Sequence, residues 1–236
     1  MSSDSAAARS APSFRHFHEQ LDELKSRLLT MSERAESLVD VAVDALLTRD
    51  ADKAQAVLFG DREVDALEVE IEQMAVQLLA LQQPMARDLR FIISAIKASR
   101  DLERVGDHAV NIAESAQRII ASGIDVTPDA EILEMARLAR QMLGQSIDAF
   151  VRADGALGRA ICRMDDDVDK LNDSLFRIVV THILEDPKTI STALELLLVS
   201  RNLERVADLS TNIGEDAVYL AEGKQIKHRA EQHNEP

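Results

Sequence analysis

The chain has 236 residues, of which 42 are acidic and 27 are basic, and its formal net charge is −15. This acidity argues against binding to nucleic acid or anionic membranes, because both are negatively charged, and it suits cations and basic partners. Eight Gly, five Pro and no Trp are typical of an all-helical protein. The single cysteine, Cys162, excludes an internal disulfide and suits a reducing compartment. No apolar stretch approaches the roughly 20 residues that span a bilayer, so we expect a cytoplasmic protein with no membrane insertion.

The first half of the chain predicts three helices. Residues 1–13 have the Ser/Ala-rich composition of a disordered tail. Apolar residues then recur in steps of three and four, which predicts long amphipathic helices up to Gly123. We expect turns at Asp50–Asp52 and before Pro84, which can begin the third helix. Long antiparallel helices joined by short turns form a bundle, and we assign residues 14–123 to it.

The second half repeats this pattern. Thr127–Pro128 supplies a capping residue and a first-turn proline. We expect three more helices within residues 127–223, with breaks at Asp154–Gly155 and near Pro187. Residues 224–236 form a polar tail. The sequence thus predicts an all-α fold of six long helices in two tandem three-helix bundles, related by a pseudo-twofold repeat.

One segment of the third helix recurs in the sixth. Residues 99–107 (Ser-Arg-Asp-Leu-Glu-Arg-Val-Gly-Asp) return as residues 200–208 (Ser-Arg-Asn-Leu-Glu-Arg-Val-Ala-Asp), and an internal repeat fixes the architecture before any local detail. The shared polar residues fall on one face of each helix: Glu103, Asp107, Asn111 and Glu114, and Glu204, Asp208, Asn212 and Glu215. Carboxylates four residues apart repel by roughly 0.2–0.5 kcal/mol unless a cation lies between them.

A second acidic pair precedes each motif. It consists of two aspartates four residues apart: Asp61 and Asp65, and Asp165 and Asp169. Glu68 and Glu72 extend the first pair but have no acidic counterpart in the second copy. Counting about 19 and about 21 residues from the hairpin turn places both pairs roughly 30 Å from it. Four carboxylates thus share one height on adjacent helices, where such hard oxygen ligands can hold one metal ion or a small multinuclear cluster.

The alternative interpretation is a solvated helix face whose acids are neutralised by nearby arginines. The arginines concerned are Arg100, Arg104, Arg201 and Arg205. The repeat and the matched heights favour the metal site, and we expect these arginines to contact the ligands or a neighbouring helix rather than the metal. His108 is replaced by Leu209 in the second copy, so we interpret it as a peripheral polar residue, with metal ligation as a lesser alternative.

Residues 98–114 closely resemble the signature of the PhoU family, and residues 83–90 and 202–215 also match the family pattern. The resemblance extends from Phe14 to about Tyr219. It implies tandem three-helix bundles and metal binding through paired acidic motifs, with iron or zinc in some members and magnesium or manganese also open. By position the ligands are Asp61, Asp65, Glu103 and Asp107, and Asp165, Asp169, Glu204 and Asp208.

The resemblance also implies a biological role. Members are cytoplasmic, commonly homodimeric, negative regulators of the phosphate-starvation response that link the phosphate ABC transporter to a sensor histidine kinase and modulate phosphate uptake. We therefore expect no enzymatic activity. The alternative is a carboxylate-bridged di-metal oxidase or metal-storage protein. Ferritin-like proteins of that kind use Glu-x-x-His on four helices, whereas no histidine here follows a Glu by three residues. Asn202 in place of Asp101, and Leu209 in place of His108, make the second copy differ from the first.

Overall fold

A computed structural model describes residues 7–82, 84–124 and 130–226. The elements are α1 (Ala7–Thr48), α2 (Ala51–Gln82), α3 (Ala86–Ser122), α4 (Ala130–Arg152), α5 (Gly155–Glu185), the short 3₁₀ helix η1 (Pro187–Thr189) and α6 (Ile190–Glu222). The described part of the chain contains no β strand. The expected all-α fold with six long helices is therefore confirmed.

The helix ends follow local capping chemistry. The Asp50 carboxylate accepts hydrogen bonds from the first backbone N–H groups of α2, and Asp154 does the same for α5. Gly123 ends α3 at φ 65°, a left-handed conformation that costs glycine nothing. These three breaks were predicted from the sequence.

Three other boundaries differ from the prediction or fall outside the described residues. Helix α1 already begins at Ala7, inside the segment predicted to be a disordered tail. Pro84 precedes α3 rather than beginning it, because the extended Met85 is the residue before the first helical turn. The predicted cap at Thr127–Pro128 and most of the C-terminal tail lie outside the described residues.

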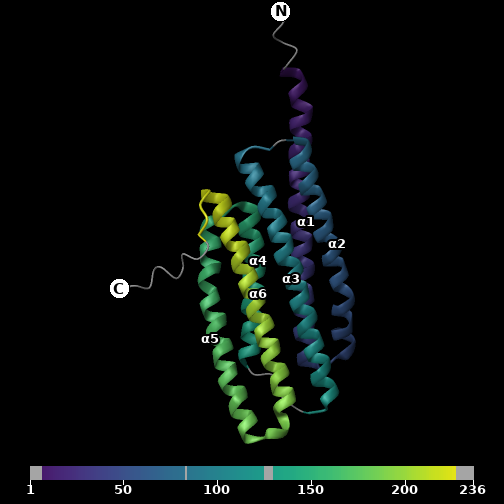
Figure 1. Cartoon of the computed structure of the whole chain (residues 1–236), viewed down its shortest axis with the longest axis vertical. Helices are drawn as coiled ribbons and strands as arrows, with labels where there is room; N and C mark the ends of the chain where they lie inside the picture. Colours follow the sequence, from purple (N-terminus) through teal and green to yellow (C-terminus); the bar gives the residue numbers. More distant parts are fainter. Residues whose placement is uncertain (1–6, 83, 125–129, 227–236) are drawn as a thin grey trace, which may run out of the picture.

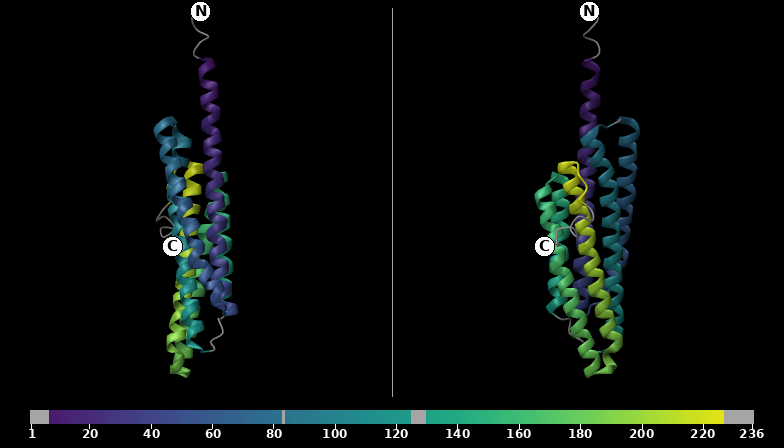
Figure 2. Two further views of the ribbon diagram at one scale, coloured as in Figure 1. Left: turned by 90° about the vertical axis from the view of Figure 1, so that its right-hand side faces the viewer. Right: turned by 60° about the vertical axis from the view of Figure 1, so that its left-hand side comes forward.

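The helices form two bundles side by side (Figure 1). Helices α1, α2 and α3 pack together, as do α4, α5 and α6, and the bundles meet where α3 contacts α6 and α1 contacts α4. Helices α2 and α5 lie at the outer edges, and the α2–α3 and α5–α6 hairpins point to opposite ends (Figure 1). The N-terminal turns of α1 extend beyond the other helices (Figure 2).

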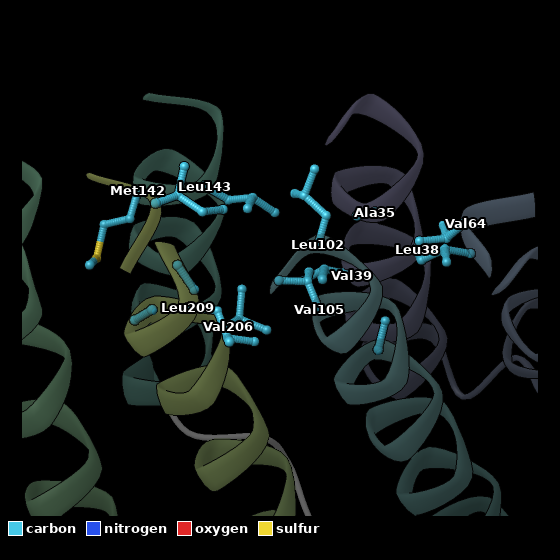
Figure 3. Packing of buried hydrophobic residues seen from close by; sticks show 14 of the residues in the cluster. Ala35, Leu38, Val39, Val64, Leu102, Val105, Met142, Leu143, Val206 and Leu209 are labelled. Carbon is cyan, nitrogen blue, oxygen red and sulfur yellow. The ribbon is translucent and has the colours of Figure 1, made fainter. Parts of the chain in front are cut away.

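The repeated motif supplies core residues as well as acids. Leu102 and Val105 on α3 face Val39 on α1, while Val206 on α6 lies in the other bundle (Figure 3). All four side chains are essentially buried, and each such burial stabilises the fold by about 1.5–3 kcal/mol. The core thus fixes the rotation of α3 and α6, and the acidic face of each motif is turned toward its hairpin partner. No described helix is long and apolar enough to cross a membrane.

Candidate metal centres

The first acidic centre lies between α2 and α3. Asp61 is half-buried, and its Oδ1 atom is shielded from water and has no hydrogen-bond partner. A Cβ atom added to Gly106 would lie 2.5 Å from this oxygen, so Asp61 rests directly on the α3 backbone. Burial, with the charges of Asp65 and Asp107, raises the pKa of Asp61 to about 6. Burial also raises the pKa of Glu103, with Asp107 as the largest charge contribution. The four predicted carboxylates therefore share one electrostatic environment.

The second centre repeats this arrangement between α5 and α6. Asp165 is half-buried, and its Oδ1 atom also lacks a hydrogen-bond partner. Burial, with the charges of Asp208 and Asp169, raises the pKa of Asp165 to about 7. The pKa values of Asp169 and Glu204 are raised by burial and then by Asp208. Thr211 Oγ1 is a further buried oxygen beside this centre, and the Thr211 hydroxyl interacts with the Asp165 carboxylate closely enough to lower its pKa against the effect of burial. The comparison of repeat copies did not reveal this residue.

The first-half arginines do not touch the predicted ligands. Arg100 on α3 pairs with Glu72 on α2 at 3.2 Å, which ties the two helices together. Arg104 lies 3.7 Å from Asp101 on its own helix. Arg100 thus pairs with a neighbouring helix, and within the described part of the chain no arginine or lysine forms an ion pair with the four carboxylates of the first centre.

The second centre is more compensated. Arg205 Nη1 lies 2.7 Å from Asp208 Oδ2, and Asn172 Nδ2 donates to Glu204 Oε2 at 3.2 Å. Arg201 forms no ion pair within 4 Å with a described residue, although its charge lowers the pKa of Glu204 against the effect of burial. The two centres therefore have carboxylates at equivalent positions, but they differ in the neighbouring groups that compensate the charge.

The additional candidate ligands lie at the margin of the centres. Asn111 is exposed and Asn212 is half-buried. Glu114 turns to Arg118 on its own helix, with 3.5 Å between the charged atoms. Glu215 lies close to the single cysteine, and its charge adds to the burial that raises the pKa of that thiol to about 11. None of these four is required to explain the electrostatics of the carboxylate pairs.

His108 has a different place from the one predicted. It is not peripheral: its Nδ1 atom lies 2.9 Å from Asn202 Oδ1 across the contact between α3 and α6. The reason is that α3 packs against α6 along the face that carries these two residues. His108 and Asn202 are both positions at which the two repeat copies differ. These differences mark the contact between the bundles, but a comparison of the copies does not show which residues face each other across it.

The residues present fit a hard cation. The predicted ligands of each centre are all carboxylates. One carboxylate oxygen in each centre is buried and has no hydrogen-bond partner. The neighbouring carboxylates repel one another. Such a donor set suits ions that prefer oxygen ligands, whereas zinc in proteins more often takes nitrogen and sulfur. Within the described ranges, no three His, Cys, Asp or Glu side chains already stand in a coordinating arrangement. Binding would therefore require the exposed carboxylates to turn toward the buried one.

The fold and the two centres define a helical-bundle protein built from two copies of one acidic three-helix unit. The PhoU domain family model matches the chain twice, over residues 28–116 and 132–217. The chain belongs to the PhoU family, which confirms the expectation from the repeated motif.

Curated relatives match along most of the chain. A phosphate-specific transport system accessory protein PhoU homolog of Aquifex aeolicus is 37% identical and covers 89% of this chain and 95% of its own length. The homolog of Pseudomonas putida is 36% identical, with 90% and 83% covered. The crystal structure of PhoU from Pseudomonas aeruginosa aligns with a TM-score of 0.85 at 35% identity, covering 88% of this chain and all of that one. The regulatory protein PhoU of Streptococcus pneumoniae gives 0.81 at 27% identity, with 89% and 99% covered.

Proposed function

We propose that this chain is a regulator of phosphate transport that acts from the cytoplasm. It links a phosphate ABC transporter to a sensor histidine kinase and represses the phosphate-starvation response while phosphate is abundant. The observation that supports this proposal most is the acidic motif repeated on α3 and α6, within a chain of which 89–90% matches relatives named phosphate-specific transport system accessory proteins. The acidic surface, with a net charge of −15, suits basic surfaces of protein partners.

The two acidic centres bind metal ions in this proposal. Asp61, Asp65, Glu103 and Asp107 hold the first, and Asp165, Asp169, Glu204 and Asp208 hold the second. A bound cation supplies positive charge that offsets the repulsion among the carboxylates. The residues of each centre then tie the outer helix of a bundle, α2 or α5, to the helix at the bundle contact, α3 or α6. The ions are structural or regulatory, and the chain is not an enzyme.

The alternative of a di-metal oxidase or metal-storage protein has less support. Each bundle has three helices, and no histidine is among the groups that shift the pKa values of Asp61 and Asp165, the half-buried residues of the two centres. His108 is engaged with Asn202 at the contact between the bundles. The nitrogen ligands that such di-metal proteins use are therefore missing from the described part of both centres.

The regulatory role is tested by gene deletion. A strain without the gene should express a phosphate-responsive reporter in phosphate-rich medium, and the reintroduced wild-type chain should restore repression. Normal repression in the deletion strain would contradict the proposal. Sedimentation of the purified chain tests the homodimer that the family resemblance implies, and a pull-down with the cytoplasmic part of the kinase tests the partner.

A further inference from the structure

An open groove of about 540 Å³ lies on the surface of α5 and α6, between the second acidic centre and the turn that joins these two helices. Its apolar lining consists of Phe176, Leu194, Leu197 and Leu198. The Phe176 side chain is 58% exposed. Val180 and Ile190, also exposed, lie one turn nearer to the hairpin on the same helices. Clustered apolar exposure of this kind marks binding surfaces in globular proteins.

The first repeat copy shows that the fold does not require this groove. Glu72 on α2 occupies the position of Phe176, and it pairs with Arg100 at 3.2 Å. The counterpart of that arginine is Arg201, which lines the groove and has no ion pair within 4 Å in the described part. One change, from Glu to Phe, thus removes an interhelical ion pair and exposes an aromatic ring. A surface that served only solubility would keep the charged pair.

The upper end of the groove opens onto the second acidic centre. Ser200 Oγ donates to Asn172 Oδ1 at 2.9 Å, and Asn172 Nδ2 donates to Glu204 Oε2 at 3.2 Å. Asn172 thereby joins the groove lining to a predicted ligand. Asp173 lines the groove as well, and Asp169 lies one helical turn from it on α5, in the direction of the second acidic centre. The apolar lining of the groove is therefore followed, along the same two helices, by the carboxylates of the second acidic centre.

We infer that this groove docks an amphipathic, basic helix of a partner protein. Such a helix would place large apolar side chains over Phe176 and Leu198 and basic side chains over the carboxylates one or two turns further on. The inference rests on the proposed function only in requiring that a partner exists, and it does not depend on bound metal.

Charge selects this occupant over two others. A second copy of the chain also carries a net charge of −15. Asp173 and Arg201 in the groove lining offset each other, but docking through this face would bring the carboxylates of the second acidic centre against like charges. An anionic membrane surface meets the same repulsion. A basic helix satisfies both parts of the surface, because its apolar side covers the groove and its charges meet the acids.

A model peptide provides the test. The probe is a fluorescently labelled synthetic helix with Leu at positions i, i+3 and i+7 and Lys in its last two turns, titrated into the full chain with chelator present. We expect saturable binding that weakens about tenfold or more in Phe176→Glu, because this substitution removes the aromatic side chain that the bound peptide would bury. That variant installs the residue found in the first copy, beside an arginine able to pair with it, so the fold should persist; circular dichroism checks this.

The chain contains a matched control. Phe59 on α2 is also 58% exposed, so Phe59→Glu changes the same area and charge on the other bundle and should leave the peptide affinity unchanged. Equal binding to the wild type and Phe176→Glu, or equal losses in both variants, would overturn the inference. So would Phe176-dependent binding to phosphatidylglycerol vesicles without peptide binding, or Phe176-dependent self-association.

A second arm separates this inference from the proposed function. The Phe176→Glu chain, returned to the deletion strain, should fail to repress the phosphate-responsive reporter, whereas Phe59→Glu should repress it. If the deletion strain itself represses normally, the regulatory role fails while the peptide result still stands. If the deletion strain is derepressed but Phe176→Glu represses fully, the docking surface fails and the regulatory role stands.

Discussion

His108 and Asn202 join the two bundles through a 2.9 Å hydrogen bond between residues 94 positions apart. The histidine Nδ1–H donates, because an amide oxygen only accepts, and the Asn202 amide nitrogen is already bound to the Leu198 carbonyl at 2.7 Å. Each residue marks a departure from the repeat, since the other copy has Leu209 or Asp101. The two departures therefore form one complementary contact.

This contact should show energetic coupling. In a double-mutant cycle of His108→Ala and Asn202→Ala, measured by urea unfolding, we expect a coupling of about 0.5–1.5 kcal/mol, typical of one hydrogen bond. His182→Ala, which removes an exposed histidine on α5, should change the free energy of unfolding by less than about 0.5 kcal/mol. Strictly additive effects of the first two substitutions would show that the contact contributes nothing.

Gly106 should matter for metal affinity rather than for stability. Gly106→Ala places a Cβ where Asp61 Oδ1 now lies, so the carboxylate must turn away from the first centre. The gain of about 1 kcal/mol in helix propensity offsets part of this cost, and we expect the free energy of unfolding to stay within about 1 kcal/mol of wild type. Isothermal titration should show weaker metal binding at the first centre.

The control for Gly106→Ala is Gly144→Ala on α4, where an added Cβ meets only ordinary contacts with Glu36. It should gain the same propensity with no change in metal binding. If Gly106→Ala binds metal as wild type does, Asp61 is not held in place by this close approach.

The metal-free chain should lose stability as the pH rises from about pH 4 to about pH 7. The pKa values of Asp61 and Asp165 in the folded state are about 6 and about 7, above their unfolded values, so the native state binds more protons between about pH 4 and pH 7. The free energy of unfolding therefore falls over this range. Asp61→Asn and Asp165→Asn should each remove part of the fall and add about 1 kcal/mol near pH 7.5, less than the full pKa shift because water screens half-buried groups.

Urea unfolding with chelator, from about pH 5 to about pH 8, measures this slope for the wild type and both variants. An identical slope in all three would mean that these carboxylates do not carry the pH dependence. Asp148→Asn, which neutralises an exposed carboxylate paired with Arg152, serves as the control and should keep the wild-type slope.

The two centres should differ in affinity because of one arginine. Arg205 pairs with Asp208 at 2.7 Å, so a metal ion must compete for that oxygen, whereas Arg104 in the first copy turns to Asp101. We expect weaker metal binding at the second centre and a partial recovery in Arg205→Ala, with no such gain at the first centre in Arg104→Ala. Equal affinities in the wild type would contradict this role of Arg205.

Local chemistry made much of the fold predictable. Asp50, Gly123 and Asp154 end or begin helices through hydrogen bonds and backbone conformations that depend only on neighbouring residues, so the sequence was sufficient there. The beginning of α3 was misplaced because a proline is acceptable both within a first turn and just before it. The apolar period also could not show that α1 extends back to Ala7.

Relations between helices were less accessible. Helix counting placed Asp61 beside Glu103 correctly in height, but not the close approach of Asp61 to Gly106, which depends on the distance between α2 and α3. The bond between His108 and Asn202 depends on how the bundles dock. A sequence repeat predicts the structure of each bundle, but it does not show which residues of one bundle face the other. The contact of His108 with Asn202 was therefore not predicted.

Metal content, measured by mass spectrometry on chain purified from metal-replete cells, tests the two-centre account most directly. The wild type should carry metal, Glu103→Ala/Asp107→Ala should lose the share of the first centre, and adding Glu204→Ala/Asp208→Ala should remove the rest. Glu63→Ala/Glu70→Ala, which removes two exposed carboxylates of α2 that pair with arginines of α1, should keep the wild-type content. A wild type with no more metal than the four-fold variant would contradict the account.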